Sequence, residues 1–140
     1  SSVVLTAYIP MLTDAGGNAG SQSTSTIICG MAVGDIRPRD LPRILWREWR
    51  VGLLCGGTLA VCNFAKLMLL DRVGFGVAMV VCLTLECTVL LSQLIGGVLP
   101  VIAKKLKMDP AVMASPLITT IVDTTTLLIY FNIAKALLHL

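Results

Sequence analysis

The chain has 140 residues, of which 56% are hydrophobic and 14% are charged, and its formal net charge is +3. A composition this apolar and this poor in charge excludes an ordinary soluble domain and indicates an integral membrane protein. The positive balance does not indicate a nucleic-acid partner, because the basic residues occur in short connections between apolar segments.

Four segments are long enough to cross a bilayer, whose hydrocarbon core needs about 20 residues of helix. We therefore predict an all-α fold, a polytopic membrane helix bundle with four transmembrane helices and a short basic interfacial helix. The whole chain, residues 1–140, is expected to be one transmembrane domain. Its expected spans are residues 3–33, 51–70, 76–103 and 110–138.

The first of these segments differs from the others because its ends are apolar and its centre is small and polar. Lipid offers no hydrogen-bonding partner, so such a helix is stable only where it faces other protein or a wet cavity. We interpret it as one wall of a cation path. The residues expected to line that path from this segment are Asp14, Gly17, Asn18, Ser21, Gln22 and Ser25.

The connection after this segment is rich in arginine. Asp40 is a plausible N-cap for the interfacial helix, on which Arg43, Arg47 and Arg50 fall on one face at i, i+4 and i+7. This face is either a dock for anionic lipid or an acidic partner, or an anchor that obeys the positive-inside bias.

The distribution of basic residues also predicts the orientation. Connections 34–50 and 104–109 contain five and three lysines and arginines, whereas the turn near Asp71 contains only Arg72. Positive-inside bias places these two connections in the cytoplasm and the N- and C-termini of this chain outside. The expected location is a bacterial-type inner or plasma membrane. Because Ser1 enters an apolar run without a basic leader, we also expect an upstream part of the protein.

The five cysteines lie within apolar segments without C-x-x-C spacing, and the single histidine is His139. This pattern argues against a disulfide framework and against a zinc site. The cysteines are expected to be small packing residues.

Asp123 lies in the middle of the last apolar segment. At helical spacing it shares a mostly polar side with Thr119, Thr120 and Thr126. A carboxylate at the bilayer centre costs about 2.5 to 3.5 kcal/mol, which favours a function as an ion or proton site. The alternatives are a structural hydrogen bond between helices and an ion pair with Lys66.

The ligands in these two segments are oxygens, which hard cations such as Mg²⁺ and Ca²⁺ prefer. Mg²⁺ keeps much of its water, so one aspartate among hydroxyls and amides suits a hydrated ion. One carboxylate offsets only half of a divalent charge. A symmetric homodimer that brings two copies of Asp123 to its axis would supply the other half.

Glu86, near the middle of the third span, has no second motif around it. It is a candidate ion ligand, a proton site, or a neutral acid that is hydrogen-bonded to a neighbouring helix.

Two stretches resemble a known family. The run PMLTDAGGNAGSQ, residues 10–22, is similar to the signature of the MgtE magnesium channels and transporters, and PLITTIVD, residues 116–123, resembles the family's last transmembrane helix. The resemblance covers essentially the whole chain, as the last four spans of the membrane domain. It implies a homodimeric pathway for Mg²⁺ as the transported ion, lined by the first and fourth spans. Asp123 matches the family's pore aspartate, which binds the ion largely through its waters.

Members of that family usually have five spans, and many have cytoplasmic CBS domains that sense Mg²⁺. The partners implied are therefore membrane lipid, a second copy, an upstream transmembrane helix and a cytoplasmic regulatory domain, but no nucleic acid. The alternative functions are proton-coupled transport of another divalent cation and a non-transporting structural membrane subunit. No enzyme activity is expected, because the chain contains neither the Y-D and G-x-G-D motifs nor the G-x-S-G motif of intramembrane proteases.

Overall fold

The computed structural model describes residues 6–70, 72, 74–109 and 115–138. The prediction of an all-α fold is confirmed for these residues. Their elements in chain order are α2 (Ile9–Ala32), the 3-10 helix η1 (Pro38–Asp40), α3 (Leu41–Leu69), α4 (Phe75–Lys105) and α5 (Ser115–Leu138).

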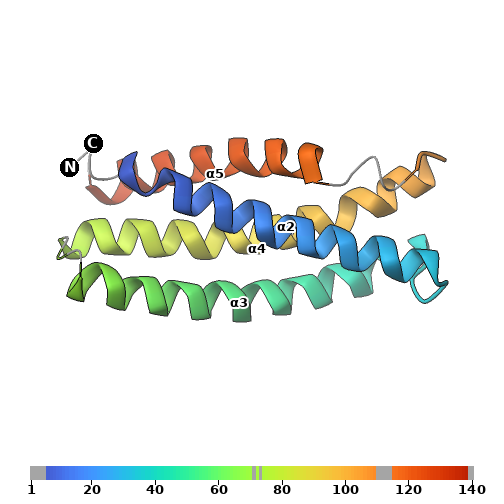
Figure 1. Ribbon diagram of the computed structural model, residues 1–140, viewed down its shortest axis with the longest axis horizontal. Helices are drawn as coiled ribbons and strands as arrows, with labels where there is room; N and C mark the ends of the chain where they lie inside the picture. The colour runs from blue at the N-terminus through green and yellow to red at the C-terminus, as the bar shows by residue number, and fades with distance from the viewer. Residues whose placement is uncertain (1–5, 71, 73, 110–114, 139–140) are drawn as a thin grey trace.

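The four long helices run alternately up and down, and α4 lies at the centre of the bundle (Figure 1). Helices α2, α3 and α5 all pack against α4, and α2 also packs against α5, whereas α2 and α3 make few contacts with one another. The start of α2, the turn between α3 and α4, and the end of α5 lie at one end of the bundle. This arrangement places α2 beside α5 although they are the first and last long helices.

Three helical stretches in the described part of the chain are long and apolar enough to cross a membrane. They are Leu41–Leu69, Phe75–Lys105 and Leu117–Leu137. Helix α2 is not among them, because its polar centre lowers its hydropathy. The prediction of four spans is therefore confirmed for three helices by length and composition, and not for α2.

The predicted basic interfacial helix is not confirmed as an element of its own. Residues 41–50 form the first turns of α3, which continues without a break to Leu69 because no helix-breaking residue separates Arg50 from the apolar run. Asp40 is the N-cap residue, as predicted, but its carboxylate makes no cap hydrogen bond to the helix. It accepts one from the Arg37 backbone N–H at 3.2 Å instead.

The other boundaries lie close to the predicted ones. Helix α4 extends two residues further than expected, to Lys105, and includes Pro100. The predicted start of the last span at residue 110 lies outside the described residues, and α5 is described from Ser115.

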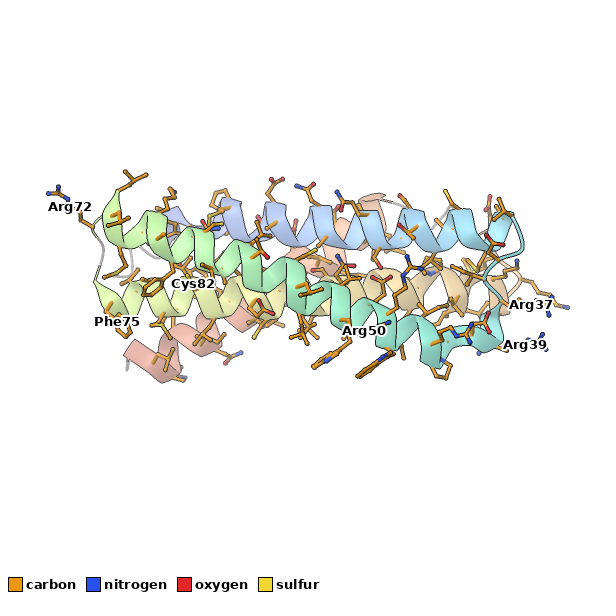
Figure 2. The ribbon with its side chains drawn as sticks, turned by 90° about the horizontal axis from the view of Figure 1, so that it is seen from below. Arg37, Arg39, Arg50, Arg72, Phe75 and Cys82 are labelled. Carbon is orange, nitrogen blue, oxygen red and sulfur yellow. The ribbon has the colours of Figure 1, made fainter. Side chains whose placement is uncertain are left out.

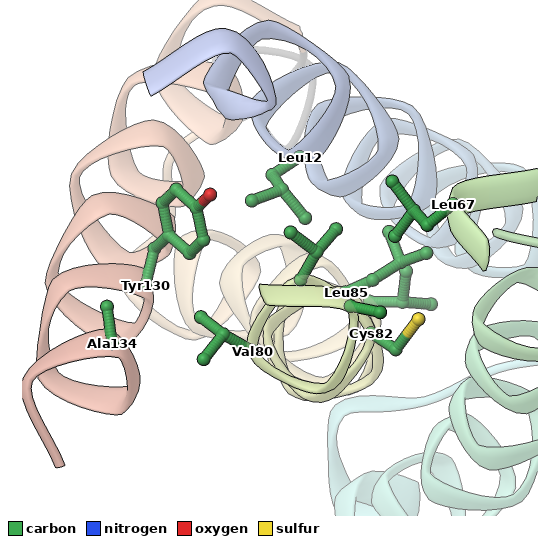
Figure 3. Close-up of a cluster of buried hydrophobic side chains, with 10 residues drawn as sticks. Leu12, Leu67, Val80, Cys82, Leu85, Tyr130 and Ala134 are labelled. Carbon is green, nitrogen blue, oxygen red and sulfur yellow. The ribbon is translucent and has the colours of Figure 1, made fainter. Parts of the chain in front are cut away.

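Apolar side chains form a cluster near each end of the bundle. At the end that contains the α3–α4 turn, Leu12, Leu67, Leu85 and Tyr130 converge from the four long helices (Figure 3). At the other end, the smaller cluster consists of Ile27, Met31, Ile44 and Val101. The first cluster joins all four long helices, and the second joins α2, α3 and α4.

Between these clusters, α2 approaches its neighbours through glycines. A Cβ on Gly16 would lie 2.6 Å from the Thr88 methyl carbon and 2.7 Å from Val122 Cγ1. A Cβ on Gly96 of α4 would meet the backbone carbonyl of Gly20. Gly16 and Gly20, which form a G-x-x-x-G pair, thus allow the α2 backbone to enter the groove between α4 and α5.

Candidate cation site

Helices α2 and α5 line an open cavity of about 290 Å³. Its residues on α2 recur at steps of three and four, so they share one face of that helix. The residues that line it are Pro10, Thr13, Asp14, Gly17, Asn18, Ser21, Thr119 and Asp123.

The cavity contains carboxylates from both helices, Asp14 from α2 and Asp123 from α5. The Asn18 amide donates a hydrogen bond to Asp14 Oδ2 at 3.4 Å, which orients that carboxylate. Gly17 brings the α2 backbone close to α5, since a Cβ there would lie 3.9 Å from the Thr119 hydroxyl oxygen. All the polar side chains in this cavity present oxygen atoms, which are the ligands of hard cations.

Most of the residues that the sequence predicts for a path lie in this cavity, but four do not. Gln22 lines a second cavity, and Ser25 and Thr120 are exposed on the outside of their helices. Thr126 is 1% exposed and packs inside the bundle, where its hydroxyl has no hydrogen-bond partner among the described residues. Pro10, which also lines the cavity, was not predicted as a site residue, and neither was Thr13, although both lie on the face of Asp14.

The second cavity, of about 410 Å³, lies on the other side of α2, between α2, α3 and α4. Asp14 and Asn18 line both cavities, so the polar face of α2 is wide enough to border two separate spaces. Gln22 of α2, Asn63 of α3 and Gln93 of α4 add amide groups to this second space.

The alternative explanation of Asp123 as an ion-pair partner of Lys66 is not supported. Lys66 is not among the residues that line the cavity of Asp123. The Lys66 ammonium lies 6.0 Å from the centroid of the Tyr8 ring, near the start of α2.

Glu86 lies outside both cavities, and its carboxylate faces α3. A Cβ on Gly56 would lie 2.7 Å from Glu86 Oε2, and one on Gly57 would lie 3.7 Å from it. Oε2 is buried and has no hydrogen-bond partner among the described residues. Glu86 therefore belongs to the α3–α4 contact and not to the cavity that contains Asp123.

A second buried acid, Glu48, was missed by the sequence analysis. It is only 4% exposed and lies beside Ser23 of α2, whose hydroxyl donates a hydrogen bond to the Gln93 carbonyl oxygen of α4 at 2.9 Å. A Cβ on Gly97 would lie 3.1 Å from Glu48 Cγ, which shows how closely the side chain approaches α4. The signal was present in the sequence, because Glu48 repeats at steps of four with the buried residues Ile44 and Gly52.

Known proteins share the sequence of these helices. Residues 9–133 match the MgtE family, described as a divalent cation transporter. The chain is similar to the "Magnesium transporter MgtE" of Bacillus subtilis, at 34% identity over 139 residues that make up 98% of this chain and 30% of that protein. It is also similar to the protein of that name from Thermus thermophilus, at 36% identity over 138 residues, or 94% of this chain and 29% of that protein. A third similar protein, the "Magnesium transporter MgtE" of Enterococcus faecalis, is 30% identical over 132 residues. These residues make up 94% of this chain and 29% of that protein.

Proposed function

Because the chain belongs to the MgtE family of divalent cation transporters, we propose that it conducts Mg²⁺ across a membrane through a path lined by α2 and α5. The relatives are named as magnesium transporters, and this chain spans about three tenths of their length. The observation that best supports the path is the shared cavity, which Asp14 of α2 and Asp123 of α5 both line.

In this proposal, Asp123 holds the ion through its waters. A water molecule occupies about 30 Å³ in the liquid, so the six waters of hydrated Mg²⁺ need roughly 180 Å³. The cavity of about 290 Å³ is large enough for this group. Asp14 and Asn18 on the facing helix, with the hydroxyls of Ser21 and Thr119, would accept hydrogen bonds from the outer side of the same waters.

Helix α2 is the fourth membrane-crossing helix in this proposal. Its 24 residues extend about 36 Å, longer than a hydrocarbon core of about 30 Å. The polar residues of its first half face the two cavities, and the hydroxyls of Ser23 and Thr24 donate hydrogen bonds to carbonyl oxygens of α4. Gly16 and Gly20 face α4 and α5. The arginine-rich end of the bundle lies in the cytoplasm, so that α2 begins and α5 ends outside.

A second copy of the chain would complete the path. Asp14 and Asp123 of one chain offset the charge of one divalent ion, but the wall opposite α2 and α5 has to come from elsewhere. A homodimer with its axis beside this cavity supplies that wall and a second pair of carboxylates.

The test is Mg²⁺ uptake in Mg²⁺-starved, transport-deficient cells that express the full-length protein with Asp123→Asn. Loss of the charge weakens the hydrogen bonds to the ion's waters, and we expect uptake to fall by about tenfold or more. Thr124→Ala is the matched control, because Thr124 is the next residue along α5 but is exposed outside the cavity. Unchanged uptake by a normally expressed Asp123→Asn variant would exclude the proposed ion site.

A further inference from the structure

A third cavity lies at the opposite end of α2 from Pro10 and is separate from the proposed path. Its volume is about 320 Å³, and it is formed by the last turns of α2, the connection that follows, and the first turns of α3. Its charged lining residues are Asp35, Asp40, Arg43 and Arg47.

The walls of this cavity are held by backbone hydrogen bonds. Gly34 has a φ of +85°, and the N–H groups of Asp35 and Gly34 donate to the carbonyls of Gly30 and Met31 at 2.9 and 3.2 Å. This is a Schellman motif, which ends α2 and fixes the direction of the connection. The Ile36 side chain packs directly on Gly30. A Cβ at residue 30 would collide with this side chain. The acidic wall is therefore held in place relative to α2.

The charges of the cavity balance, but they do not neutralise one another directly. Asp40 accepts a hydrogen bond from the Arg37 backbone N–H, and no ion pair within the described chain joins either aspartate to Arg43 or Arg47. Arg43 and Arg47 are one turn apart on α3, so both guanidinium groups can reach one anion. A ligand that satisfies all four side chains has an anionic and a cationic group a few atoms apart.

The length and composition of α3 favour a position of this cavity near the lipid headgroups. The 29 residues of α3 extend about 43 Å, which exceeds the hydrocarbon core by about 13 Å. Its apolar run occupies the far end, so the turns that contain Arg43 and Arg47 project beyond the core. Trp46 and Trp49, on the same turns, are 61% and 41% exposed, as is typical of side chains at a membrane interface.

We propose that this cavity binds the headgroup of phosphatidylethanolamine, with its phosphate on Arg43 and Arg47 and its ammonium on Asp35 and Asp40. An ammonium group with three N–H donors can hydrogen-bond to the carboxylates, whereas the choline group of phosphatidylcholine has no N–H. Phosphatidylglycerol has a phosphate without a cation, so it leaves the two carboxylates unsatisfied. The cavity thus selects a zwitterionic lipid with a primary amine.

The experiment is a lipid titration of the detergent-solubilised, full-length protein, followed by native mass spectrometry, with the three lipids bearing identical acyl chains. We expect phosphatidylethanolamine to bind about tenfold more tightly than either of the others. Arg43→Gln combined with Arg47→Gln should abolish this preference. Asp35→Asn should shift the preference toward phosphatidylglycerol, because the cavity then has a net positive charge.

The matched control is Arg37→Gln combined with Arg39→Gln, which removes the same charge from the same end of the bundle but outside the cavity lining (Figure 2). This variant should keep the lipid preference. Equal binding of the three lipids, or an unchanged preference in Asp35→Asn, would overturn the proposal. So would displacement of the lipid by inorganic phosphate at equal concentration, since the site would then recognise a free anion.

Discussion

The Thr24 hydroxyl of α2 donates a hydrogen bond to the Gly96 carbonyl oxygen of α4 across 3.0 Å. In a regular helix this carbonyl would accept from the N–H of residue 100, but that residue is Pro100, which has none. The hydroxyl of a neighbouring helix therefore replaces the donor that the proline removes. This hydrogen bond joins α2 to α4 at the point where their glycines bring the two backbones together.

Replacing Thr24 by valine should destabilise the bundle. Valine keeps the shape of the side chain but leaves the Gly96 carbonyl without its donor, and an unsatisfied buried acceptor costs about 1 to 3 kcal/mol. The measurement is the free energy of unfolding in detergent. Thr26→Val is the control, because the exposed Thr26 hydroxyl bonds only to Gln22 of its own helix. Equal effects of the two substitutions would contradict the role assigned to Thr24.

Gly96→Ala should also destabilise the protein, because its Cβ would collide with the Gly20 carbonyl and push α2 away from α4. Overpacking of this kind costs about 1 to 3 kcal/mol. Gly57→Ala provides the contrast, since its Cβ would have only an ordinary contact at 3.7 Å with Glu86 Oε2. That substitution should be neutral or stabilise α3 by about 0.5 to 1 kcal/mol. Thermal unfolding of both variants side by side tests the expectation, which fails if Gly57→Ala is the more damaging.

Glu86→Gln should leave Mg²⁺ uptake close to that of the unchanged protein, because Glu86 faces Gly56 and lies outside the cavity lined by Asp123. The measurement is the cell uptake assay described above, repeated in vesicles with an imposed pH gradient. An effect as large as that of Asp123→Asn would show that Glu86 acts in transport. A flux that depends on the proton gradient only while Glu86 is present would favour proton coupling.

Glu48→Ala should destabilise the end of the bundle that contains the arginines. The substitution leaves a cavity beside Gly97 and Ser23, with an expected loss of about 2 kcal/mol or more. Glu48→Gln keeps the volume and a polar head group, so it should cost less than half as much. Unfolding in detergent distinguishes the two variants, and an equal loss would show that the charge of Glu48 is required.

The length and position of the helices could be predicted because apolar runs of bilayer length determine them. The meeting of Asp14 and Asp123 in one cavity could not be derived from either helix alone, since it depends on how both pack against α4. Thr126 shows that helical spacing alone does not identify which side chains face the cavity. It is three residues from Asp123, but it shares the buried face of Val122 and Tyr130, which lie four residues before and after it.

The dependence on tertiary packing also explains why Glu48 was missed and why an interfacial helix was expected in the connection 34–50. A segment dense in arginine appears amphipathic and superficial when it is considered alone. Its opposite face contains Ile44 and Glu48, and their burial depends on Ser23 of α2 and Gly97 of α4, which are distant in the sequence. Tertiary contacts therefore decide the role of this segment.

The attachment of α2 to α4 has a mechanical consequence. Backbone contact at Gly20 and Gly96, together with the hydrogen bond from Thr24, makes these two helices a single rigid unit. Helix α5 meets α2 through apolar side chains such as Val122, which packs on Gly16. The distance between Asp14 and Asp123 therefore depends on the position of α5. It widens or narrows when α5 moves relative to the joined pair α2 and α4.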